Sequence, residues 1–178
     1  MKDFLTGDHS ELDALLGELF AALDAGDARR IYQKLDLFWA RLAMHIRAEH
    51  LHLFPAILGA FDSENKASRA FDFEAVQNAI AKQRADHDFF MVELAKAMKR
   101  MRGWSEHEPN SSISHSLVRE TIVAVRRRLE THNQSEESEI YQWVDILLNP
   151  LERENLNERM RKELDNLPPR FGKPGETR

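Results

Sequence analysis

A chain of 178 residues, 42% of them hydrophobic, is long enough for one domain with a substantial core and is not typical of a disordered protein. Glycine and proline are few, whereas helix-forming residues dominate, which favours an all-α fold. The formal net charge of −5 argues against nucleic acid as a partner, and the absence of cysteine excludes disulfides, thiolate zinc sites and cysteine-ligated iron–sulfur clusters.

Apolar residues recur at three- and four-residue intervals along most of the chain, which predicts long amphipathic helices. We expect the first helix from about Asp8 to Asp24, with Gly26 ending it. We expect the second from about Asp27 to Phe61, with Pro55 weakening its last turns. Residues 59–69 have the composition of a polar connection.

The second half of the chain repeats this organisation. A third helix is expected over about 71–102, and residues 103–112, with Pro109-Asn110, are expected to form a loop. A fourth helix is expected over about 113–148, ended by Asn149-Pro150.

Four long amphipathic segments with modest connections predict an antiparallel up-down four-helix bundle over residues 1–150. Residues 151–178 are then a C-terminal extension, with a short helix to about Leu167 and a flexible tail from Pro168.

Two matching cassettes place polar side chains where the helix seam should be apolar. One contains His45 and Glu49, and the other contains His132 and Glu136. Residues four apart lie on one face of a helix, so each cassette directs an imidazole and a carboxylate into the core. Because a buried carboxylate is costly unless something cationic pairs with it, a metal is the simplest cation to infer.

Two further histidines, His9 and His87, belong to the same layer of the predicted bundle. Residues equidistant from a turn lie at the same height in an antiparallel hairpin, and the midpoints between successive histidines of His9, His45, His87 and His132 all fall in predicted turns. Four imidazoles and two carboxylates suit iron, manganese or zinc. Two ions bridged by the carboxylates use this set more naturally than one ion does.

This arrangement resembles the hemerythrin family in its bacterial HHE cation-binding form. The resemblance covers about residues 8–148 and is carried by His9, HIRAEHLHLFP in the second helix, ADHDFF in the third and HNQSEESEIY in the fourth. It implies a non-haem di-iron centre in which His9 and His45 hold one iron, His87 and His132 hold the other, and both glutamates bridge. The implied metal ligands are His9, His45, Glu49, His87, His132 and Glu136.

The chain departs from this pattern near the third helix. Hemerythrins proper have a further histidine one turn before the one matching His87, and here that residue is Gln83. One iron is then one imidazole short, which leaves an open position, a water or a substitute such as His52. His50 stands where HHE sequences commonly have a second glutamate, and we expect it at the surface.

Glu137 is an alternative bridging carboxylate in the fourth helix. Its five-residue offset from His132 rotates it by about 140° around an α-helix, so Glu136 is preferred.

The leading functional hypothesis is a non-haem di-iron protein that binds or senses dioxygen or nitric oxide. One alternative is a di-iron enzyme that handles peroxide or nitric oxide stress, in which iron–sulfur repair is disfavoured by the lack of cysteine. Another is a metal-dependent regulatory module that docks a second copy or a protein partner. No apolar run reaches the length of a membrane span and no signal peptide is recognisable, so we expect no membrane partner and a cytoplasmic location.

Overall fold

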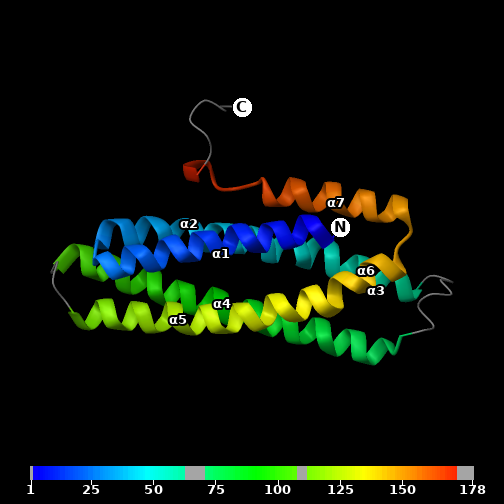
Figure 1. The fold of residues 1–178 in the computed structure, drawn as a ribbon, viewed down its shortest axis with the longest axis horizontal. Helices are drawn as coiled ribbons and strands as arrows, with labels where there is room; N and C mark the ends of the chain where they lie inside the picture. Colours follow the sequence, from blue (N-terminus) through cyan, green and yellow to red (C-terminus); the bar gives the residue numbers. More distant parts are fainter. Residues whose placement is uncertain (1, 63–70, 108–111, 172–178) are drawn as a thin grey trace.

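The structure, a computed structural model, describes residues 2–62, 71–107 and 112–171. These residues are almost entirely helical, and no strand occurs among them, so the all-α prediction is confirmed. Helix α1 packs against α2 and α5, and α4 packs against the same two helices, so four helical paths enclose one core (Figure 1).

The first connection is a tight turn between α1 (Lys2–Ala25) and α2 (Ala28–Ala48). Gly26 has a φ of 68°, a left-handed conformation that glycine adopts without a steric penalty. The Asp27 side chain then accepts a hydrogen bond of 3.0 Å from the Arg30 backbone N–H and caps α2. This turn lays α1 along α2, and α1 begins several residues before the predicted start.

Helix α2 continues without a break through a π-helical turn, η1 (Glu49–Leu53), into α3 (Phe54–Asp62). Pro55 occupies the first turn of α3, where a missing backbone N–H is tolerated. The helical path therefore extends past Pro55, as predicted. Just before the proline, it changes from α-helix to a π turn.

The second half contains α4 (Phe73–His107), α5 (Ser112–Ser135), a second π turn, η3 (Glu136–Ile140), and α6 (Tyr141–Leu147). The prediction of a loop from residue 103 is wrong for residues 103–107, which remain in α4. A glycine in a helix interior costs only about 1 kcal/mol, so Gly103 alone does not end a helix. The rest of the expected loop, residues 108–111, lies outside the described residues.

Helix α7 (Pro150–Leu164) runs along the outside of the bundle and packs against α2 and η1 (Figure 1). It starts with a capping box, in which Asn149 and Glu152 each accept a hydrogen bond from the other's backbone N–H. A 3-10 turn, η4 (Pro169–Phe171), follows, and Arg170 pairs with Asp36 at 2.9 Å. The remainder of the predicted tail lies outside the described residues.

The hydrophobic core consists of two clusters. One contains Leu12, Phe38, Leu94 and Val125 among others. The second lies at the end of the bundle where α3, α6 and α7 pack together. The second includes Leu5, Phe54, Ile57, Tyr141, Leu156 and Met160. In each of the four long helical paths, the predicted ligand histidine lies in sequence between residues of the two clusters. The polar side chains therefore form a layer across the core.

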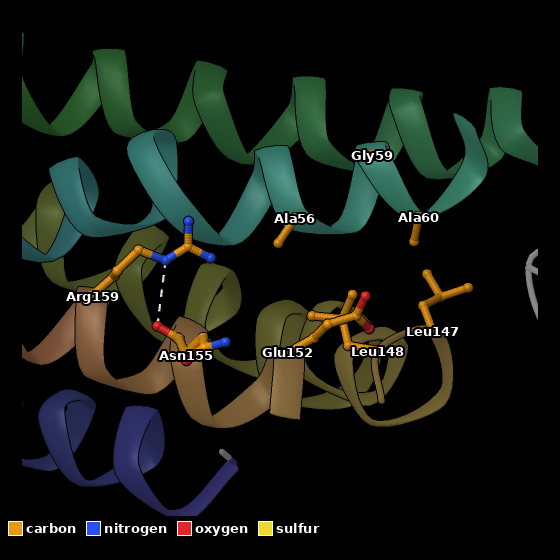
Figure 2. A pocket seen from close by; sticks show the side chains of 8 residues that line it. All are labelled: Ala56, Gly59, Ala60, Leu147, Leu148, Glu152, Asn155 and Arg159. Atoms are coloured by element: carbon orange, nitrogen blue, oxygen red, sulfur yellow. Dashed lines mark hydrogen bonds between the residues drawn. The ribbon is translucent and has the colours of Figure 1, made fainter. Parts of the chain in front are cut away.

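A surface hollow of about 270 Å³ lies between α3 and α7 (Figure 2). Small residues of α3 line one side and polar residues of α7 the other, where Arg159 donates to the Asn155 backbone carbonyl at 3.3 Å. None of the six predicted ligands lines it. Within the described part of the chain, every helix is too short or too polar to cross a membrane.

Helix α7 contributes to stability through side chains that it buries against the bundle. Met160 is fully buried, so we expect Met160→Ala to lower the free energy of unfolding by about 2–5 kcal/mol. Leu151→Ala is the control on the same helix, because Leu151 is 66% exposed and should change stability by less than about 0.5 kcal/mol. Urea unfolding followed by circular dichroism measures both, and equal effects would contradict docking of α7 in solution.

Candidate metal centre

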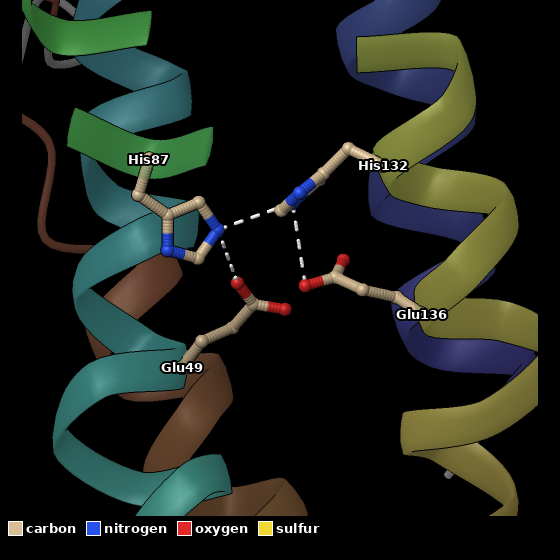
Figure 3. Close-up of side chains that lie close together, drawn as sticks. All are labelled: Glu49, His87, His132 and Glu136. Atoms are coloured by element: carbon tan, nitrogen blue, oxygen red, sulfur yellow. Dashed lines mark hydrogen bonds and ion pairs between the residues drawn. The ribbon is translucent and has the colours of Figure 1, made fainter. Parts of the chain in front are cut away.

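All six predicted ligands are buried, and the structure brings them together in one layer. They form two groups that share Glu136. One group is Glu49, His87, His132 and Glu136, shown in Figure 3, and the other is His9, His45 and Glu136. Within each group, one donor atom from each residue lies within 4.8 Å of all the others. Whether these atoms bind metal stays a prediction.

Each glutamate directs one oxygen toward each histidine pair. Glu49 places Oε1 3.4 Å from His45 Nε2 and Oε2 3.2 Å from His87 Nε2. Glu136 places Oε2 3.4 Å from His9 Nε2 and Oε1 3.3 Å from His132 Nε2. Both carboxylates therefore span the two pairs, as bridging carboxylates do.

Several atoms at the centre have no hydrogen-bond partner among the described residues. These are His45 Nε2, Glu49 Oε2 and Glu136 Oε1, whose ion-pair distances are short but whose directions do not suit a hydrogen bond. A buried polar atom without a partner costs about 1–3 kcal/mol and is rare in folded proteins. Their convergence fits first-row divalent cations, which take imidazole and carboxylate ligands together.

Both glutamates begin a π turn. The backbone N–H of Phe54 bonds to the Glu49 carbonyl, and that of Tyr141 bonds to the Glu136 carbonyl. Residues five apart diverge by about 140° on an α-helix, but a π turn brings them to the same face. Phe54 and Tyr141 therefore both join the polar layer, although their spacing suggests otherwise.

Tyr141 is a site residue that sequence reasoning missed. Its hydroxyl lies 2.9 Å from His9 Nε2, 3.3 Å from Glu136 Oε2 and 3.5 Å from Glu49 Oε1. Burial, reinforced by the charges of both glutamates, raises the pKa of Tyr141 well above 10. The phenol therefore remains a neutral donor directed at the carboxylates.

The outer nitrogens of the four imidazoles also have partners. His45 Nδ1 lies 2.8 Å from Asp8 and His132 Nδ1 lies 3.3 Å from Asp86. The partners of His9 and His87 differ from what the sequence predicted for Glu137 and His50. Glu137 belongs to neither donor group and instead lies 2.9 Å from His9 Nδ1. His50, expected at the surface, is half-buried, with Nε2 2.9 Å from His87 Nδ1.

His52, the suggested substitute for the absent histidine, and Gln83, which stands at that histidine's position, have different surroundings. His52 faces α7, where its Nε2 lies 3.9 Å from Glu163, so it is not in the polar layer. Gln83 is fully buried and donates to the Ser135 hydroxyl at 3.2 Å. Its carbonyl oxygen has no hydrogen-bond partner among the described residues.

Mutual pairing shifts the pKa values of the central groups. Burial of His45 opposes its protonation, but the charge of the nearby Glu49 carboxylate and the hydrogen bond with Asp8 raise its pKa well above 6.5. Burial of Glu49 raises its pKa, but the charge of His45 and the close contacts with His45 and His87 outweigh this and bring the pKa well below 4.5. Burial lowers the pKa of His132, but the Glu136 charge outweighs this and raises it. Burial and the Glu49 charge raise the pKa of Glu136, but the charge of His132 and the close contacts with His132 and His9 outweigh both and lower it.

The model of the hemerythrin HHE cation-binding domain matches residues 1–144, which are most of the chain. Searches of curated proteins and of solved structures found no match.

The central pKa shifts determine how the stability of the metal-free protein depends on pH. The stabilisation from His45, whose folded pKa is raised, is complete below 6.5 and is lost as the pH rises through that raised value. The stabilisation from Glu49, whose folded pKa is lowered, is present above 4.5 and is lost as the pH falls through that lowered value. We therefore expect these groups to stabilise the metal-free protein most between 4.5 and 6.5.

Zinc should reverse the pH dependence of stability on the alkaline side. It binds the deprotonated imidazole, so the zinc-loaded protein should become more stable as the pH rises. Melting temperatures measured across pH, with a chelator or with zinc, should therefore diverge as the pH rises above 6.5. A constant difference between the two curves would contradict the proton competition.

Proposed function

Because the chain belongs to the hemerythrin HHE cation-binding family, we propose that it is a non-haem di-iron protein that binds or senses a small ligand such as dioxygen or nitric oxide. The observation that carries this proposal is the pair of donor groups joined by glutamates that face both. The proposed ligands are His9, His45, Glu49, His87, His132 and Glu136.

The donor geometry supports two ions in preference to one. His9 and His45 lie on one side of the two carboxylates, whereas His87 and His132 lie on the other. Iron is proposed from the family, and manganese and zinc suit the same donors. When bound, ferrous ions would supply electrons and coordination positions to a small molecule.

The surroundings of the donors favour a small ligand. Phe54 stacks on His87 with the ring centres 6.0 Å apart, and Phe90 meets His132 edge-on at 5.3 Å. Both phenylalanines are fully buried, so they keep water away from these imidazoles. Tyr141 supplies an O–H donor on the opposite side, suited to a ligand that accepts a hydrogen bond.

The wider proposal follows the sequence analysis. We propose an antiparallel bundle as the domain of residues 1–150 and an extension from residue 151, in a cytoplasmic protein without a nucleic-acid partner. Self-association as a homodimer, or docking of a protein partner, remains a prediction.

Loss of either bridging carboxylate should reduce metal binding. We expect Glu49→Gln and Glu136→Gln to retain well under half of the iron that the wild-type chain holds, because a neutral amide bridges cations poorly. The matched control is Glu139→Gln, which removes an exposed carboxylate near Glu136. Elemental analysis after anaerobic iron loading and gel filtration measures the outcome. Wild-type iron content in both variants would overturn the ligand set.

The function itself is tested with the reduced iron-loaded protein. We expect an ultraviolet–visible band to appear on exposure to dioxygen or nitric oxide and to reverse when the gas is removed. Irreversible oxidation, together with repeated turnover of peroxide or nitric oxide, would instead identify an enzyme. Absence of bound iron, manganese and zinc after loading would overturn the metal centre.

A further inference from the structure

A buried aspartate joins an arginine to a candidate ligand in the first half of the chain. Asp8 on α1 accepts at Oδ2 from His45 Nδ1, 2.8 Å away, and at Oδ1 from Arg41 Nη2, also 2.8 Å away. Arg41 precedes His45 by one turn of α2. Asp8 is only 6% exposed, so these two contacts use both oxygens of a carboxylate that is largely removed from water.

The second half of the chain contains the same arrangement. Asp86 on α4 lies with Oδ2 3.3 Å from His132 Nδ1 and with Oδ1 2.6 Å from Arg128 Nε. Arg128 precedes His132 by one turn of α5, and Asp86 is 7% exposed. Two helix pairs thus build the same Arg–Asp–His chain.

Each aspartate also directly precedes a candidate ligand, since the sequence contains Asp8-His9 and Asp86-His87. The histidine of each dipeptide belongs to one donor group, and its aspartate contacts the other histidine of that group on the neighbouring helix. One short segment therefore organises both imidazoles of one candidate metal position.

We propose that Asp8 and Asp86 are positioning residues of the metal centre, a role that rests on the proposed function. A carboxylate that accepts from Nδ1–H fixes the rotation of the ring and leaves the Nε2 lone pair directed at the cation. The arginine holds the aspartate in place and offsets its burial. The two Arg–Asp–His arrangements thereby direct His45 and His132 toward the shared carboxylates.

The arginines of the two Arg–Asp–His arrangements have different further contacts. Arg41 also donates to the Leu164 carbonyl at 3.3 Å and to exposed Glu11 at 2.7 Å, which ties the first chain to α7. Arg128 is more exposed and lies over the Phe89 ring at 4.4 Å. The first position is therefore braced by a segment beyond residues 1–144, whereas the second is braced within the bundle.

The test measures zinc affinity by competition with a coloured chelator. Asp8→Ala and Asp86→Ala should each weaken the affinity of one zinc ion by about 10–100-fold. Asp8→Asn and Asp86→Asn keep an acceptor oxygen and should lose less. The matched controls, Glu18→Gln on α1 and Glu130→Gln on α5, remove exposed carboxylates outside these contacts and should bind zinc as the wild type does.

A second readout separates positioning from general stability. In the zinc-loaded wild type, the Nδ1 protons of His45 and His132 should give downfield NMR signals protected from exchange, and each alanine variant should lose one. If an alanine variant does not fold, its asparagine counterpart carries the same two measurements. Wild-type affinity and unchanged signals in the folded variants would overturn the positioning role. Failure of the wild type to bind zinc or iron would instead overturn the proposed function.

Discussion

Two glutamate carboxylates lie fully buried in the middle of a helical bundle, and the surrounding contacts offset the cost of removing them from water. That cost is several kcal/mol for each ion in a protein interior. Four imidazoles and one phenol surround Glu49 and Glu136, and the charges and contacts of the histidines hold the pKa values of both carboxyls below 4.5 despite their burial. The same contacts leave donor atoms converging without hydrogen bonds, which is the condition that a cation resolves.

The helices around this layer supply rigidity on both sides. Apolar clusters pack above and below the polar residues, so a histidine that moved would have to disturb a close-packed interior. The partners of the outer ring nitrogens come from neighbouring helices, so the orientation of an imidazole depends on how two helices pack together. Folding of the bundle and preparation of the donors are thus one process.

Much of this layer could be predicted from the sequence, because a regular α-helix has a fixed rotation and rise per residue. The midpoints between successive histidines predict that His9 and His87 lie level with the two cassettes, and the structure brings these side chains together. The choice of Glu136 over Glu137 also agrees with the geometry, because α5 remains α-helical from His132 to Ser135. Glu137 lies to one side and contacts His9 from outside.

The site residues that the sequence did not predict depend on departures from regular α-helix or on contacts between helices. Tyr141 depends on a π turn, which the apolar periodicity does not reveal, and the same turn type occurs at Glu49 next to Pro55 and at Glu136 without a proline. Asp8 and His50 act across helices, so their roles depend on side-chain directions that spacing alone does not specify.

The two π turns place Tyr141 and Phe54 at equivalent positions of the two cassettes, five residues after each glutamate. One presents a hydroxyl to His9 and the carboxylates, and the other presents a bare ring face to His87. The two sides of the donor layer therefore differ in polarity at these equivalent positions. A diatomic ligand of the kind proposed would meet a polar side at Tyr141 and an apolar side at Phe54, so its two possible orientations in this layer would differ in energy before any bond to a metal formed.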